Sequence, residues 1–221
     1  MIGTNRTKPP PMSKKQEYVQ KLSDARTNHL FKENKDQLGA LLKFGLAIRK
    51  DYREIKAAEG VTAALMCGYK TIETALAHAF AESPHTISCI GCTAAHCCHQ
   101  NVEITETEAA VIGQFCREQK ITIPRQYLRE QLTYGRENIS SADCSACVFL
   151  KDNKCGIYPV RPVNCRIHNV VGPIENCDTK NNKGAVVATL PVTAAEMIGS
   201  VLFEEGGKTG RLPKMMIKYS Q

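Results

Sequence analysis

The chain has 221 residues, 43% of them hydrophobic, and no tryptophan, so we expect one domain with a core of aliphatic side chains. Its net charge of +7 lies partly in the two tails and favours a solvated surface over a nucleic-acid-binding one. Neither a secretory signal nor an apolar run of membrane-spanning length is visible, which predicts a cytoplasmic protein without a membrane partner. Cysteines that cluster in that compartment are typically metal ligands or catalysts.

The N-terminal third predicts helices behind a flexible start. Residues 1–30 are basic and contain three consecutive prolines, which indicates a flexible segment, with a helix from about Ser13 to His29. Apolar residues recur at helical spacing over residues 35–58 and again over 61–82, with Gly60 as the stop between them. Cys67 lies in the second of these helices, where a single cysteine is expected to be a small core residue. Residues 31–85 therefore form a helical region.

The first cysteine segment, Cys89–Cys98, reads CIGCTAAHCC and contains four cysteines. Its glycine and small residues predict a loop or tight turn. His96 and His99 flank the adjacent cysteine pair, and each is either a further metal ligand or an ordinary polar loop residue.

A second helical stretch separates this segment from the next cysteines. Thr105 and Glu108 have the spacing of a capping box, so a helix should run from Glu106 to about Gln119 and bury Cys116. Residues 124–134 predict another helix, with a proline at its first position. Near the C-terminus, Thr193 and Glu196 repeat the capping-box spacing and predict a helix to about Glu204.

The second cysteine segment, Cys144–Arg166, reads CSACVFLKDNKCGIYPVRPVNCR. A turn is expected at Asp152, and two prolines keep the following stretch out of regular helix. Two Cys-x-x-Cys pairs, one in each segment, suit a metal because a tight turn brings both sulfurs to one side. The candidate metal ligands are Cys89, Cys92, Cys97, Cys98, Cys144, Cys147, Cys155 and Cys165.

Eight thiolates are enough for two tetrahedral ions or for one four-iron cluster with cysteines to spare. Adjacent cysteines such as Cys97 and Cys98 point in different directions along an ordinary backbone, so they serve different centres or only one is a ligand. Thiolate sites are strongly negative, which suggests charge compensation by Arg161, Arg166 or Lys151. Spacing alone leaves the metal open between zinc and an iron–sulfur cluster.

At these residues the chain resembles the CxxCxxCC, or YkgJ-like, cysteine-cluster family, described as zinc- or iron-chelating proteins. The resemblance covers about residues 86–180. The matching positions are Cys147, Phe149, Leu150, Cys155, Ile157, Tyr158, Arg161, Pro162, Cys165 and Arg166.

Three features qualify the resemblance. Four residues separate Cys92 from Cys97 where the family has two, and Val148 replaces a usual proline. The eighth family cysteine corresponds to Cys144 or Cys177.

Flagellin lysine methylases carry a related motif with an iron–sulfur cluster, a similarity that favours iron–sulfur over zinc.

The sequence thus predicts a mostly α, small helical domain with irregular cysteine-rich loops around a metal or iron–sulfur centre. The expected divisions are residues 1–30, 31–85, a metal-binding part at 86–180 and a C-terminal helical segment at 181–221. The favoured function is metal binding, with a structural or redox centre. The alternatives are a cluster-dependent, methylase-like protein-modifying enzyme and a zinc-stapled module that binds nucleic acid or protein. No phosphate loop, catalytic triad or cofactor fingerprint assigns catalytic residues.

Overall fold

The computed structural model describes residues 35–90, 92, 94–134, 146–178, 181 and 186–220. The chain divides into two compact units, Met1–Phe44 and Gly45–Gln221. Of the first unit, only Lys35–Phe44 is described, and it is helical. The helix expected near Ser13–His29 lies outside the described residues. The second unit contains the rest of the fold.

Two long helices confirm the predicted N-terminal pattern. Helix α2 spans Lys35–Glu59 and helix α3 spans Val61–Glu82. Gly60 separates them with a φ of 93°, a conformation that glycine adopts without the steric cost of a Cβ. Among the described residues, no helix combines the length and the apolar character that a membrane crossing requires.

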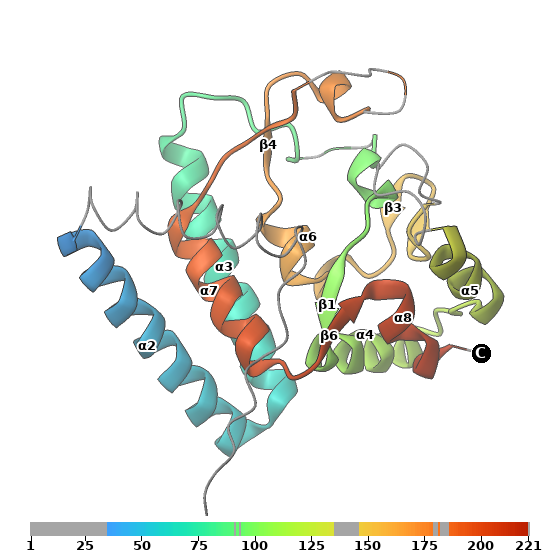
Figure 1. Ribbon diagram of the computed structural model, residues 1–221, viewed down its shortest axis with the longest axis horizontal. Coiled ribbons are helices and arrows are strands. Elements are labelled where there is room, and N and C mark those ends of the chain that lie inside the picture. Colours follow the sequence, from blue (N-terminus) through green and yellow to red (C-terminus); the bar gives the residue numbers. More distant parts are fainter. Residues whose placement is uncertain are drawn as a thin grey trace, which may run out of the picture. The chain divides into compact units, whose positions relative to one another are not determined.

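Helix α7, Thr193–Glu205, packs along α3, and Figure 1 shows the two helices side by side. Gly68 of α3 makes this approach possible, because a Cβ there would come within 2.6 Å of the Leu202 side chain. The predicted start of α7 is right, but its capping box is wrong. Val192 is the N-cap residue and makes no side-chain cap hydrogen bond, so Thr193 is already inside the helix.

Helix α4, Glu106–Glu118, begins with the predicted capping box. The Thr105 side chain accepts a hydrogen bond from the Glu108 N–H, and the Glu108 side chain accepts one from the Thr105 N–H. The preceding strand β1, Glu103–Thr105, pairs antiparallel with β6, Thr209–Arg211. Helix α5, Arg125–Tyr134, confirms the helix predicted over 124–134, but Pro124 precedes its first residue instead of occupying it. The C-terminal segment adds the short helix α8, Leu212–Met216, and the 3-10 turn η5, Ile217–Tyr219. Helices α5 and α8 pack together beside α4.

The cysteine segments form the irregular part of the fold. The described elements there are the 3-10 turn η1 (His96–His99), strands β2 (Leu150–Lys151) and β3 (Lys154–Cys155), η3 (Tyr158–Val160), α6 (Val163–Ile167), β4 (Val170–Val171), η4 (Ile174–Cys177) and β5 (Ala188–Thr189). Strands β2 and β3 form one antiparallel ribbon, and β4 and β5 form another. The predicted fold class, mostly α with irregular cysteine-rich loops, is confirmed.

The two cysteines in helices α3 and α4 differ from each other in burial. Cys116 is 2% exposed in the hydrophobic core, as predicted. Cys67 is exposed, so its prediction as a core residue is wrong. The buried stripe of α3 runs through Ala64, Leu65 and Tyr69, and Cys67 falls on the opposite side of the helix. Helical periodicity predicted α3 correctly, but residue type alone placed Cys67 on the wrong face of the helix.

Candidate metal centre

The start of the first cysteine segment is held against the chain that follows α6. Ile87 forms a β-bridge with Val171, and the Ser88 backbone N–H donates to the Val170 carbonyl at 2.9 Å. The Cys89 sulfur accepts a hydrogen bond from the Val170 N–H at 3.1 Å. Its thiol also lies 3.6 Å from the His168 carbonyl oxygen. These contacts fix Cys89 beside β4, which leads into η4 and Cys177.

The end of the first segment is joined to the second. The Cys147 N–H donates to the Cys98 carbonyl at 2.7 Å, and the Leu150 N–H closes a turn on the Cys147 carbonyl at 2.9 Å. Leu150 is the register partner of Cys155 in the β2–β3 ribbon. The two segments predicted to supply ligands are therefore packed together, with Cys98, Cys147 and Cys155 at the junction.

The predicted turn at Asp152 creates this ribbon. Asp152 and Asn153 have φ values of 49° and 56°. Positive φ at both central residues is typical of the two-residue hairpin turn that matches the twist of antiparallel strands, and Asp and Asn tolerate it better than most side chains. The turn reverses the chain, so that Cys155 returns to the side on which Cys147 lies.

Cys165 lies in α6, whose first turn is anchored by a buried carboxylate. Glu108 is 1% exposed, and one of its oxygens accepts from the Val163 N–H at 2.7 Å and from the Tyr69 hydroxyl at 3.1 Å. The other oxygen accepts from the Thr105 N–H at 2.7 Å. The same side chain that caps α4 thus also binds the start of α6 and positions Cys165.

Arg166 fixes the other side of the Cys165 loop. It is 1% exposed, stacks 4.0 Å over the Tyr69 ring, and donates to the Arg161 carbonyl at 2.9 Å and the Pro159 carbonyl at 2.6 Å. Its guanidinium also pairs with Glu73. Most of its hydrogen-bonding capacity is therefore used to hold the loop. Sequence reasoning missed Tyr69, Glu73 and this role of Glu108, since only tertiary contacts reveal them.

Burial and mutual repulsion keep most of the clustered thiols protonated. Burial raises the pKa of Cys147 to about 11, with added contributions from the nearby Cys155 and Cys97. Burial also raises the pKa of Cys165 and of Cys155, and negative charge on neighbouring cysteines adds to both shifts. Thiolates at these positions need a cation close by, and a metal ion is the cation that thiolates bind directly.

The adjacent pair behaves differently from the expectation that its side chains diverge. The Cys98 thiol hydrogen-bonds to the Cys97 sulfur, an interaction that lowers the pKa of Cys97 to about 6 and raises the pKa of Cys98. Both residues lie in η1, which begins after Ala95 in a left-handed conformation with a φ of 53°.

The charge of Arg161 acts on several of the clustered thiols. Its positive charge lowers the pKa of Cys97 and moderates the raised pKa values of Cys89, Cys155 and Cys165. The side chain stacks 4.1 Å over the Tyr158 ring, and its buried Nε has no hydrogen-bond partner among the described residues. A buried donor without a partner, on a side chain whose charge acts on these thiols, fits a site that carries extra negative charge, such as a thiolate-bound metal centre.

The donor set suits zinc or iron, but the ligands are not arranged in a finished coordination shell. Among the described residues, no three Cys, His, Asp or Glu side chains already form a group that could hold an ion. Metal binding would therefore require rotation of the thiols. Cys144 lies outside the described residues. His96 and His99 are half-buried at the two ends of η1, and their role as ligands stays a prediction.

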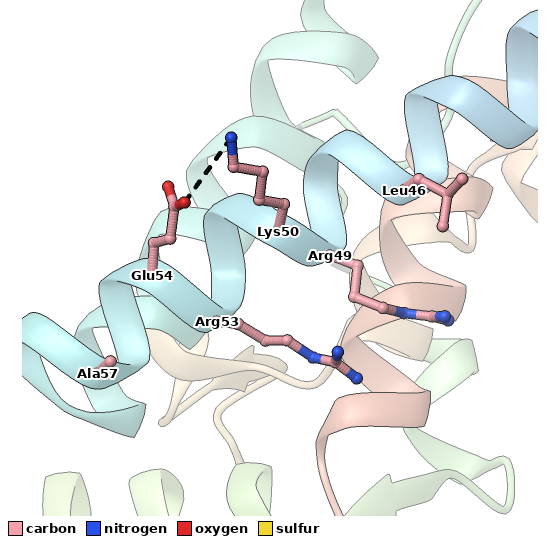
Figure 2. Close-up of a pocket in the computed structure, with 6 residues that line it drawn as sticks. All are labelled: Leu46, Arg49, Lys50, Arg53, Glu54 and Ala57. Carbon is pink, nitrogen blue, oxygen red and sulfur yellow. Dashed lines mark ion pairs between the residues drawn. The ribbon is translucent and has the colours of Figure 1, made fainter.

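A surface pocket lies away from the cysteines, along α2. Its lining residues are Leu46, Arg49, Lys50, Arg53, Glu54 and Ala57, and Figure 2 shows all six projecting from this one helix. Arg53 bonds to a Glu205 oxygen at 2.7 Å, and Arg49 pairs with Glu204. Because carboxylates of α7 neutralise both arginines, this surface offers little support for a nucleic-acid site.

Comparison with known families agrees with the cysteine chemistry. Residues 88–188 match the CxxCxxCC family model, described as "Putative zinc- or iron-chelating domain". The matched region includes both cysteine segments, the α6 loop and Cys177. Searches of curated proteins and of solved structures found no match. The match confirms, for residues 88–188, the resemblance to the CxxCxxCC cysteine-cluster family that the sequence predicts.

Proposed function

We propose that this protein binds zinc or an iron–sulfur cluster through cysteine thiolates drawn from both segments. The ligands are Cys89, Cys92, Cys97, Cys98, Cys147, Cys155 and Cys165, with Cys144 or Cys177 as the eighth. The observation that carries the proposal is the junction between the segments, where the Cys147 N–H bonds to the Cys98 carbonyl at 2.7 Å. The chelating family that residues 88–188 resemble supports the same assignment.

The centre is structural or transfers electrons. A nucleophilic cysteine normally has a depressed pKa, because only the thiolate attacks. Cys97 has a lowered pKa, but its cause is the neighbouring Cys98 thiol. Burial raises the pKa of Cys147, Cys155 and Cys165, as expected of metal ligands whose protons leave when the ion binds. When bound, zinc supplies folding energy without redox chemistry, whereas an iron–sulfur cluster also accepts and donates electrons.

Anaerobic purification followed by elemental analysis tests this function. We expect zinc, or iron with inorganic sulfide, bound to the full-length chain, and absorption near ~400 nm if the centre is iron–sulfur. Cys155→Ser should lose metal, because a hydroxyl that stays protonated replaces a soft thiolate. Cys67→Ser is the matched control, since Cys67 is exposed on α3 and outside both segments. A metal-free wild-type chain, or full metal content in Cys155→Ser, would contradict the proposal.

A further inference from the structure

The short helix that carries Cys165 packs its opposite face into the core. Helix α6, Val163–Ile167, lies against α3 and α7. Val163 and Arg166 are three residues apart and lie on one face of this helix, and each is 1% exposed. Cys165 precedes Arg166 directly, so it lies off this face, and it is half-buried. The contacts that hold Val163 and Arg166 therefore determine where the Cys165 thiol lies.

Two residues of α3, one helical turn apart, hold the two ends of α6. The Tyr69 hydroxyl donates to a Glu108 oxygen at 3.1 Å, and the same oxygen accepts from the Val163 N–H at 2.7 Å. Glu73 pairs directly with the Arg166 guanidinium. The Tyr69 ring also lies 4.0 Å from the Arg166 guanidinium and covers it. Helix α3 thus contacts the start of α6 through a shared carboxylate and its end through an ion pair.

The charge of Arg166 needs a partner, because the side chain is removed from water. Two of its nitrogens donate to the Arg161 carbonyl at 2.9 Å and to the Pro159 carbonyl at 2.6 Å, but these acceptors are neutral. The carboxylate paired with it is Glu73, whose side chain is 54% exposed. Removing one partner of a buried ion pair is costly, since the other charge is left buried without compensation.

We propose that Glu73 is a positioning residue of the metal centre, which acts through Arg166 to fix α6 and so the Cys165 thiol. This inference rests on the metal-binding function proposed above. It gives Arg166 the role of holding the ligand loop, in place of the charge compensation at the thiolates that the sequence suggests. Because Glu73 lies half in solvent, replacing it removes the counter-charge of Arg166 and leaves the apolar core unchanged. Arg166 then moves toward water, and α6 turns with it.

Amide hydrogen exchange of the reduced, metal-free, full-length chain tests the positioning directly. The Cys165 and Arg166 N–H groups donate to the Pro162 carbonyl at 3.0 and 3.1 Å. We expect Glu73→Gln to speed exchange of these two amides, measured by NMR, while the amides of α5 keep their wild-type rates. A general loss of stability would speed exchange in both places. Unchanged rates at α6, or an equal rise at α6 and α5, would overturn the proposal.

Zinc affinity, measured by competition with a chromophoric chelator, tests the consequence for the centre. We expect Glu73→Gln to weaken zinc binding by about 10–100-fold, the usual effect of changing a residue that orients a metal ligand. Glu73→Lys should weaken it further, because a second cation then lies beside Arg166. Glu54→Gln is the matched control, since Glu54 pairs with Lys50 on α2 and its side chain is 65% exposed. This variant should keep the wild-type affinity.

The possible results separate this inference from the proposed function. Wild-type zinc affinity in Glu73→Gln overturns the inference alone. An equal loss in Glu73→Gln and Glu73→Lys also overturns it, because the charge at this position would then have no effect. A wild-type chain that binds neither zinc nor iron overturns the proposed function, and the exchange rates of the metal-free chain still show whether Glu73 holds α6.

Discussion

Replacing Glu108 by glutamine is the sharpest test of how the fold positions the site. The carboxylate is buried and accepts hydrogen bonds from Val163, Tyr69 and Thr105, so it joins α6, α3 and the start of α4. An amide has the same shape but only one oxygen. Whichever way the new amide is turned, its NH₂ group faces a backbone N–H, of Val163 or of Thr105, that loses its acceptor.

The magnitude follows from these contacts. One buried N–H without an acceptor costs about 1–3 kcal/mol, and the hydrogen bonds that survive lose the strengthening given by a charged acceptor. We expect a loss of about 2–4 kcal/mol in the free energy of unfolding, measured by urea denaturation at equal metal loading. Because Val163 begins the helix that carries Cys165, metal affinity should fall as well.

Glu106→Gln is the matched control, since it makes the same chemical change two residues earlier on the same helix. Glu106 is exposed and pairs with Lys218 at 3.6 Å on the surface, an interaction worth less than about 1 kcal/mol. If Glu108→Gln costs no more than Glu106→Gln, the buried carboxylate does not hold α6. A change in the denaturant m-value instead of the midpoint would indicate an altered unfolded state.

Three further predictions concern α3, α4 and their cysteines. Cys67 should react quickly with a maleimide in the folded chain, whereas Cys116 should react only after unfolding. Cys67→Ser should change the free energy of unfolding by less than about 0.5 kcal/mol. Slow labelling of Cys67 would contradict its exposure. Burial raises the pKa of Cys116 to about 11. As the pH rises, the thiol of the unfolded state therefore loses its proton first. The stability that Cys116 contributes is complete below about pH 8.5 and falls by up to about 2 kcal/mol as the pH rises to about 11. Urea denaturation across this pH range should show a smaller decline in the free energy of unfolding for Cys116→Ala than for the wild type, and an equal decline in both would refute the assignment. Gly68→Ala should destabilise by about 1–3 kcal/mol in thermal or urea unfolding despite alanine's higher helix propensity, because the new methyl meets Leu202 of α7; a stabilised variant would show that α3 and α7 are not packed this closely.

Local patterns in the sequence were sufficient to predict the helices and to predict cysteine as the type of metal ligand. The apolar spacing of residues 35–58 and 61–82 gives α2 and α3 within a residue, because one face of each helix must be apolar to pack. The Thr105–Glu108 spacing gives the start of α4, since a capping box involves only four consecutive residues. Cysteine spacing and the turn at Asp152 likewise depend on neighbours in the chain.

The tertiary structure alone decided which of those residues meet. Nothing in the sequence indicates that Glu108 caps α4 and binds Val163 at the same time, because the two residues are brought together only when the chain folds and α6 reaches the start of α4. Cys67 and Cys116 look alike as single cysteines in apolar helices, yet one is exposed and the other buried, since the neighbouring helix decides which face is covered. The position of Cys89 beside β4 depends in the same way on the pairing of residues 86–88 with residues 170–172, a contact between segments about eighty residues apart. Spacing along the chain determines which side chains can bind a metal, and long-range packing determines which of them share one.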